Sequence, residues 1–227
     1  MSDTLTLTAA DGHTFPAYVA RPAGAPKGGI VVLQEIFGVN SHIRSVADRF
    51  AAAGYFAVAP STFSRVQTGV ELGYTEDDMK AGFGLKMAVD ALPAPGVMAD
   101  IQAAIDHAAQ AGRVGIVGYC WGGLLTWRAA CSLRGLSAAV PYYGGGMTAP
   151  DDAARRPQVP VLAHFGDQDH WIPLDTVEAF KAAQPGVAVH VYAANHGFNC
   201  DQRGSYNAAA ADLARERTLA FFGQHVG

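Results

Sequence analysis

A glycine-flanked segment around one cysteine is the part of the sequence best suited to covalent chemistry. Residues 118–122 read Gly-Tyr-Cys-Trp-Gly and directly follow the apolar run Val114–Val117. This is the G-x-S-x-G nucleophile elbow with sulfur in place of oxygen, in which a strand turns sharply into a helix and holds the nucleophile at the turn. Because the positive end of the helix stabilises a thiolate, Cys120 is the predicted nucleophile.

The alternative role for each of the three cysteines is that of a small buried apolar side chain, which is common for a free cysteine. At Cys120 the flanking glycines and the strand-to-helix context favour catalysis. Cys131 is expected to be structural, and so is Cys200, although its nearness to His196 leaves a minor role in the site open. Three widely spaced cysteines without a C-x-x-C pair do not indicate a disulfide framework, so we expect a reducing, cytoplasmic location.

A thiol nucleophile needs a base, and the base needs an orienting acid. In the elbow fold the acid and then the histidine follow the nucleophile along the chain. Asp169 and His196 come just after the expected strands 161–165 and 187–192. Sites in open α/β sheets collect at the carboxyl ends of strands, so the predicted triad is Cys120, Asp169 and His196.

Other polar residues near these strands are weaker candidates. Asp167 is the alternative acid, but the loop from Asp169 to Pro173 resembles the acid turn of the elbow fold. His170 adjoins Asp169 and is poorly placed to face it, and His164 is expected to be a satisfied core histidine. The same residues could be metal ligands, but they lack the H-E-x-x-H spacing and strand alternation points them apart, so we expect no metal and no cofactor.

The segment 34–40, Gln-Glu-Ile-Phe-Gly-Val-Asn, ends another buried strand. Glu35 either faces solvent there or lies beside the thiol as a second proton acceptor, since a carboxylate buried without a partner is costly. The backbone N–H groups of Ile36 and Trp121 are the expected oxyanion hole, because the elbow fold draws its donors from these two places. Phe37, in the same loop, is a candidate substrate contact.

The elements that position these residues form an α/β pattern. Short apolar runs predict parallel strands at 29–35, 55–59, 114–117 and 161–165. Two further runs, at 138–142 and 187–192, are weaker strand candidates. Helices are expected at 41–53 with Ser41 as N-cap, and at 97–111, 121–133, 174–183 and 205–222. Alternating residues at 3–8 and 14–20 predict an antiparallel hairpin at the sheet edge. The pattern therefore predicts a mostly parallel sheet with helices on both faces.

The stretch 60–96 contains many glycines and prolines. Residues 75–90 are a possible helix, because Glu76, Asp77 and Asp78 place negative charge at its start. We interpret this stretch as an excursion over the sheet edge that forms part of a pocket wall.

The composition is that of a globular protein. Of 227 residues, 50% are apolar and 16% charged, and the net charge is −4. We expect one domain over residues 1–227. The mild acidity argues against nucleic acid as a partner. The sequence has no apolar run of the ~18 residues that would predict a membrane span, and its first residues do not resemble a secretory signal.

Four motifs in this order resemble the dienelactone hydrolase family, also called carboxymethylenebutenolidases. They are the segments 34–40, 118–123, 168–170 and 196–198. The resemblance implies a single-domain α/β-hydrolase fold and a Cys-Asp-His triad of Cys120, Asp169 and His196. It also implies that Glu35 contacts the thiol and helps to deprotonate it when substrate arrives, and that the reaction opens a carboxylate-bearing unsaturated lactone through an acyl-enzyme.

The sequence departs from this family where its lactonases hold the substrate carboxylate with arginines. The region 75–85 has only Lys80, and the position four residues after His196 is Cys200. Arg203, and less strongly Arg65, are candidates for that role, with solvated surface arginines as the alternative.

The predicted function is hydrolysis of a small ester or lactone by a monomer or homodimer. The alternatives are a thiol-based redox protein using Cys120, or a non-catalytic binding protein on a hydrolase scaffold.

Overall fold

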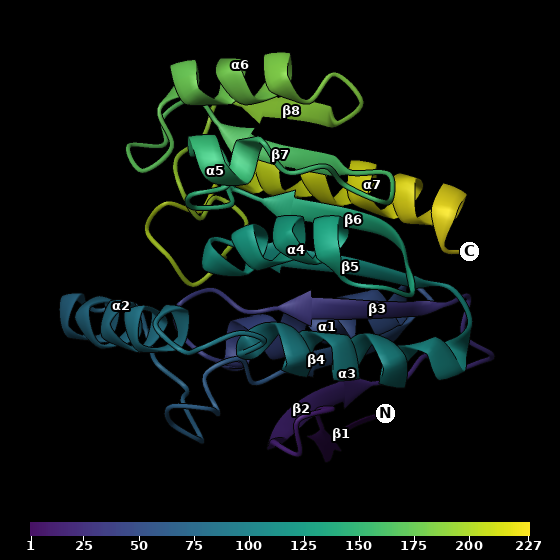
Figure 1. The fold of residues 1–227 in the computed structure, drawn as a ribbon. Coiled ribbons are helices and arrows are strands. Elements are labelled where there is room, and N and C mark those ends of the chain that lie inside the picture. Colours follow the sequence, from purple (N-terminus) through teal and green to yellow (C-terminus); the bar gives the residue numbers. More distant parts are fainter.

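The computed structural model describes residues 1–227, and an eight-stranded sheet runs through it (Figure 1). The strand order is β1-β2-β4-β3-β5-β6-β7-β8. The strands are β1 Ser2–Thr8, β2 Thr14–Ala20, β3 Gly29–Leu33, β4 Phe56–Pro60, β5 Val114–Tyr119, β6 Leu136–Tyr142, β7 Leu162–Gly166 and β8 Ala188–Tyr192. Strands β1 and β2 pair antiparallel, β2 joins β4 antiparallel, and the other pairs are parallel. The predicted mostly parallel sheet with an antiparallel hairpin is confirmed.

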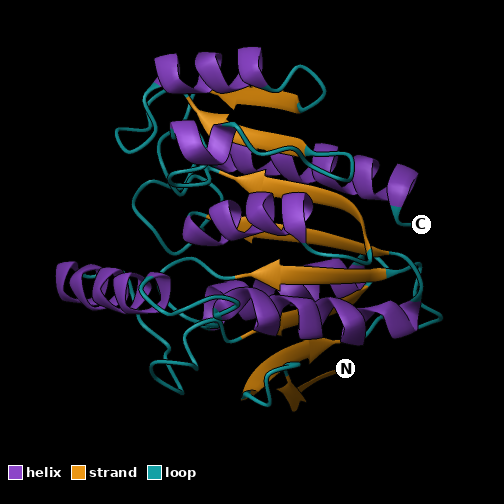
Figure 2. Cartoon of the chain, in the orientation of Figure 1, coloured by secondary structure: helices purple, strands orange, loops and turns teal.

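Helices cover both faces of this sheet (Figure 2). The helices are α1 Ser41–Ala52, α2 Glu76–Asp90, α3 Val97–Ala108, α4 Trp121–Ser132, α5 Pro150–Ala153, α6 Leu174–Ala183 and α7 Ala208–His225. Figure 1 shows α3 and α4 on one face and α1 and α7 on the other. Every residue of β3 and β5 is buried, as expected for strands covered on both sides.

Helix boundaries differ from the sequence-based predictions where a side chain caps the helix. The N-cap of α1 is Asn40 rather than Ser41, because the Asn40 side chain accepts a hydrogen bond from the Ile43 N–H at 3.3 Å. Helix α7 begins at Ala208, not at 205, since Asn207 accepts from the Ala210 N–H at 3.1 Å. The four-residue helix α5 is too short to leave a periodic pattern in the sequence.

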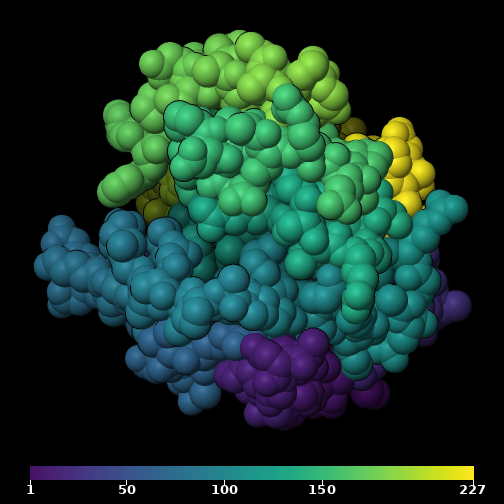
Figure 3. Space-filling model, viewed as in Figure 1, coloured from purple at the N-terminus to yellow at the C-terminus, as the bar shows by residue number.

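Helix α2 confirms the expected helix in the excursion and projects from the body of the molecule (Figure 3). Its start carries a capping box: the Thr75 hydroxyl accepts from the Asp78 N–H, and the Asp78 carboxylate accepts from the Thr75 N–H. At Gly82 the helix lies directly on the loop after β3, where a Cβ atom would overlap the carbonyl oxygen of Ile36. The excursion is therefore docked against the segment that follows the third strand.

No helix of the structure combines the length and the apolar character that a membrane crossing requires.

Two glycines of α2 provide a matched test of how this helix packs against the loop after β3. Gly82→Ala should destabilise the protein by about 1–3 kcal/mol, because the new methyl group overlaps backbone. Gly84→Ala should stabilise it by about 0.5–1 kcal/mol, since a Cβ there meets nothing within 4 Å and alanine favours a helix. Urea unfolding of both variants measures the difference, and equal effects would contradict the close approach at Gly82.

Candidate active site

Cys120 lies on a strained turn between β5 and α4. Its backbone is left-handed, with φ 56° and ψ −121°, which is uncommon for a residue other than glycine. The two flanking glycines make this turn possible. A Cβ on Gly118 would overlap the carbonyl oxygen of Gly122, and a Cβ on Gly122 would overlap that of Gln34 and lie 2.7 Å from that of Leu33. Both glycines of the motif are thus required by close backbone contacts.

Asp169 and His196 form a buried pair at the same end of the sheet. Oδ2 of Asp169 lies 2.7 Å from Nδ1 of His196, and Oδ1 accepts hydrogen bonds from the N–H groups of Trp171 at 2.8 Å and Ile172 at 3.2 Å. Asp169 follows β7 and His196 follows β8. Both carboxylate oxygens are therefore held in place, and the imidazole ring is oriented with Nε2 left for another partner.

Cys120 lies close enough to His196 to change the pKa of the histidine ring. Burial by itself lowers the pKa of His196, but the neighbouring Cys120 and Asp169, through negative charge and hydrogen bonds, outweigh burial and raise it to about 10. A sulfur beside an imidazole ring that a carboxylate orients is the arrangement that proton exchange between a thiol and a histidine requires. The structure thus brings Cys120, His196 and Asp169, which are far apart in sequence, into one site.

A cavity of about 550 Å³ opens over these residues. Cys120, Trp121, His196, Ile36, Phe37 and Arg203 all line it. Trp121 is the first residue of α4, so its backbone N–H has no partner within the helix and is available to a ligand. Ile36 lies in the loop directly after β3. Both residues of the predicted oxyanion hole therefore share the cavity with the thiol.

Glu35 is buried and does not face solvent, so the solvent-facing alternative is wrong. Its Oε1 lies 3.1 Å from Nη1 of Arg203, while its Oε2 has no hydrogen-bond partner. Arg203 is itself mostly buried and stacks over the Phe37 ring at 5.5 Å, so it is not a solvated surface arginine. The contact between Glu35 and the thiol stays a prediction.

His42 and Cys200 also lie against Glu35, a cluster that the sequence analysis did not predict. One ligand atom from each of the three residues falls within 4.8 Å of the others, and all three residues are buried. His42 Nδ1 lies 3.2 Å from the Asp201 carboxylate, and its Nε2 is unpartnered. These are metal-ligand donor types, but the Arg203 guanidinium on Glu35 disfavours a cation there. His42 lies two residues after the segment 34–40, but its position near the start of a helix did not indicate that its ring faces Glu35.

Tyr143 is a further residue of the site that the sequence analysis did not identify. It follows β6 with a left-handed backbone, φ 36°, and its ring centre lies 5.1 Å from that of His196. Its hydroxyl is buried without a hydrogen-bond partner. The available signal was its place just past the carboxyl end of a strand, ahead of three glycines.

The remaining candidates lie elsewhere. Arg65 pairs with Asp100 at 2.7 Å and with Asp11 at 2.8 Å and does not line the cavity, so it cannot hold a substrate carboxylate there. His164 is fully buried and lies 2.8 Å from the Tyr192 hydroxyl and 3.1 Å from that of Thr218, which confirms it as a satisfied core histidine. Asp167 and His170 are exposed.

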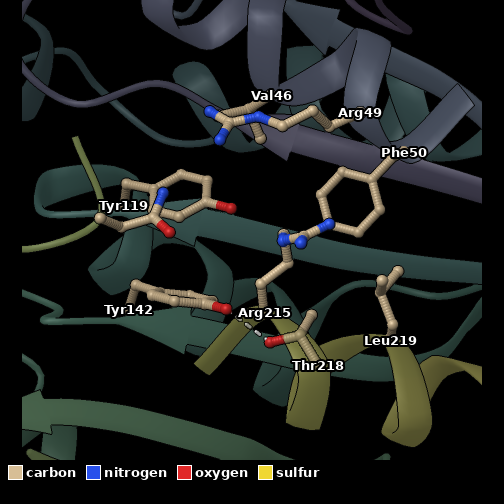
Figure 4. Close-up of a pocket in the computed structure, with 9 residues that line it drawn as sticks. Val46, Arg49, Phe50, Tyr119, Tyr142, Arg215, Thr218 and Leu219 are labelled. Carbon is tan, nitrogen blue, oxygen red and sulfur yellow. Dashed lines mark hydrogen bonds between the residues drawn. The ribbon is translucent and has the colours of Figure 1, made fainter. Parts of the chain in front are cut away.

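A second cavity, between α1 and α7, is structural. Figure 4 shows Arg49 from α1, Arg215 from α7 and two tyrosines around it. Its volume is about 20 Å³, which is room for about one water molecule. Tyr142 closes it with a hydrogen bond of 2.6 Å to Thr218. It is too small for a substrate, and Cys120 does not line it.

Comparison with known proteins assigns the chain to a family. The model of the dienelactone hydrolase family matches residues 15–226. The chain belongs to the dienelactone hydrolase family. The carboxymethylenebutenolidase of Pseudomonas putida is 37% identical over 231 residues, covering 97% of this chain and 96% of that protein.

Solved structures agree with this assignment. A protein of Klebsiella pneumoniae, provisionally named a dienelactone hydrolase, is 34% identical and superposes with a TM-score of 0.83, over 99% of this chain and 100% of that one. An esterase of Pyrococcus furiosus shares the fold at 14% identity, with a TM-score of 0.70 over 100% of this chain and 94% of that one. The predicted α/β-hydrolase fold is confirmed. Membership of the dienelactone hydrolase family supports the assignment of this chain as a hydrolase of lactones or esters.

Differences in burial predict which cysteine reacts first. Burial raises the pKa of Cys131 and of Cys200, each to about 11, so both are thiols at neutral pH and react slowly with alkylating agents. Cys120 is partly exposed in the cavity beside His196. Iodoacetamide at pH 7.5 should therefore add one label per chain, at Cys120, as read by peptide mass spectrometry. Equal labelling of all three cysteines would contradict this.

Proposed function

We propose that this family member opens ester or lactone bonds of small substrates through an acyl-enzyme on Cys120. The observation that supports this most is the buried pair of Asp169 and His196, in which Oδ2 and Nδ1 are 2.7 Å apart. Cys120 lies beside this histidine, and both residues line one cavity. This is the constellation that nucleophilic catalysis needs: a nucleophile, a base beside it, and a group that orients the base.

In the first half of the proposed reaction the Cys120 thiolate attacks the carbonyl carbon and a C–S bond forms. The carbonyl electrons move onto oxygen, where the N–H groups of Ile36 and Trp121 stabilise the charge. Collapse of this intermediate breaks the C–O bond. The departing alkoxide takes the proton from Nε2 of His196, which leaves a thioester and a neutral imidazole.

In the second half His196 takes a proton from water as the water oxygen attacks the thioester. Collapse breaks the C–S bond, releases the acid and restores the thiolate beside a protonated His196. The Asp169 carboxylate stabilises the ring in its charged state and holds it in one orientation. A lactone differs only in that its alcohol remains attached to the acid product.

Glu35 is the proposed second proton acceptor, an alternative to His196, when Cys120 is in its thiol form. Its free Oε2 is the atom that can take the thiol proton, while Arg203 holds Oε1. Arg203 lines the cavity, so an anionic group of the substrate can compete with Glu35 for the guanidinium. Arrival of such a substrate would then release Glu35 toward Cys120.

The redox alternative is less well supported. A thiol-based cycle needs a second cysteine that can reach the first, and among the cavity-lining residues Cys120 is the only cysteine. Cys131 is at the far end of α4.

Removing the sulfur tests the proposal directly. Cys120→Ala should lower the rate of p-nitrophenyl acetate hydrolysis at least ~1000-fold, because no other cysteine and no serine or threonine lines the cavity. Cys120→Ser should retain a small residual rate. Thermal unfolding, which should be nearly unchanged, controls for folding. Turnover at the wild-type rate by Cys120→Ala would refute the acyl-enzyme.

The role of the acid is tested by a matched pair of variants. Asp169→Asn removes the negative charge that helps to raise the pKa of His196, so that pKa should fall, and kcat should fall about 1000- to 10,000-fold. Asp167→Asn, two residues away and exposed, should stay within about twofold of the wild type. A steady-state comparison of the two variants with one ester decides between these carboxylates.

A further inference from the structure

Large apolar side chains are exposed around the mouth of the catalytic cavity. Met79, Phe83 and Trp171 line it and are 37%, 51% and 69% exposed. They are three of the ten exposed large apolar side chains of the chain, and they meet at one opening. A cluster of exposed apolar surface beside a cavity marks a place where a ligand is bound.

Helix α2 presents two separate apolar stripes. Gly82, Leu85 and Val89 pack on the body of the protein. Met79, Phe83 and Met87 recur every four residues and form a second stripe, which we call the α2 stripe, and all three are exposed. A helix that only covers the fold needs one apolar face, so the α2 stripe is not explained by folding.

Contacts at the end of α2 fix this stripe relative to the nucleophile. The Trp121 indole N–H donates to Asp90 at 3.2 Å, and Asp90 also accepts from Lys86 at 2.7 Å. The Lys86 ammonium lies 5.6 Å from the centre of the Phe83 ring. Trp121 is the residue next to Cys120, so one hydrogen bond ties the end of α2 to the elbow, and the Lys86–Asp90 bond lies within α2 itself.

The charges around the cavity are largely neutralised within the protein. Lys86 is paired with Asp90, and Arg203 with Glu35. Lys80, the remaining cation of the lining, is exposed and 3.9 Å from Asp77. The rim of the cavity therefore selects mainly by apolar contact.

The two sides of the rim flank different parts of an ester. Met79 and Phe83 line the same cavity as Ile36, so the α2 stripe lies on the side of the oxyanion loop. Trp171 belongs to the turn whose N–H groups hold Asp169, the partner of His196. His196, which must protonate the leaving oxygen, lines the cavity together with Trp171, and this favours an orientation with the alcohol on the Trp171 side and the acyl group toward α2.

We propose that the α2 stripe is an acyl-binding subsite, and that the enzyme prefers esters and lactones whose acyl part carries an alkyl chain or an aromatic ring. In the same proposal Trp171 covers the alcohol part of the bound ester. The cavity of about 550 Å³ is in the range that holds drug-sized ligands, well beyond a small five-membered ring. This inference rests on the proposed function, since it assumes an acyl group attached to Cys120.

The test uses p-nitrophenyl esters from acetate to hexanoate, so that the leaving group stays constant. For a half-exposed subsite, kcat/KM should rise about twofold per methylene group. Phe83→Ala should lower the hexanoate-to-acetate ratio of kcat/KM about 5- to 10-fold. Phe83→Leu, which keeps an apolar side chain, should retain most of the preference. Leu213→Ala, at a 41% exposed leucine on α7 outside the cavity, is the control and should leave the ratio unchanged.

A second series varies the alcohol of a fixed hexanoate ester from methyl to benzyl. Trp171→Ala should reduce the preference for benzyl and leave the acyl ratio intact, because the backbone N–H that holds Asp169 is retained. A wild-type acyl ratio in Phe83→Ala, or loss of that ratio in Trp171→Ala alone, would overturn the assignment. If Cys120→Ala retains full turnover, the proposed function itself fails, whatever the acyl ratios show.

Discussion

The left-handed backbone at Cys120 is the constraint on which the site depends. It turns β5 into α4 within one residue, and so places a sulfur at the positive end of a helix and at the floor of a cavity. The turn fits only because Gly118 and Gly122 carry no side chain. Since Gly122 lies against the backbone at the end of β3, the same contact sets the distance between the nucleophile and the loop that carries Glu35 and Ile36.

The parallel sheet supplies the other catalytic groups. Its strands end at one edge, so loops far apart in sequence meet there. The loop after β7 brings Asp169 and the loop after β8 brings His196 to within 2.7 Å of each other. Burial of this pair makes its electrostatics strong, and the negative charge beside the ring, rather than the effect of burial, decides the protonation of His196.

Around this core, helix α2 acts as a wall rather than as part of the sheet scaffold. It is docked by Gly82 on the oxyanion loop and tied by Asp90 to Trp121, and it leaves an apolar face toward the opening. The arrangement joins catalysis and selectivity physically, because one helix contacts both the residue next to the nucleophile and the space where a substrate must lie.

The sequence by itself determined the strand and helix order, the elbow around Cys120 and the family, because these follow from local periodicity, glycine spacing and short motifs. Only the tertiary structure showed that Arg203 pairs with buried Glu35, that Arg65 pairs with Asp100 instead, and that His42, Cys200 and Tyr143 surround the site. The physical reason is that ion pairs and buried clusters join side chains from different elements, 35 residues apart for Arg65 and Asp100 and 168 apart for Arg203 and Glu35. Their partners are set by how the elements pack, which no local pattern records.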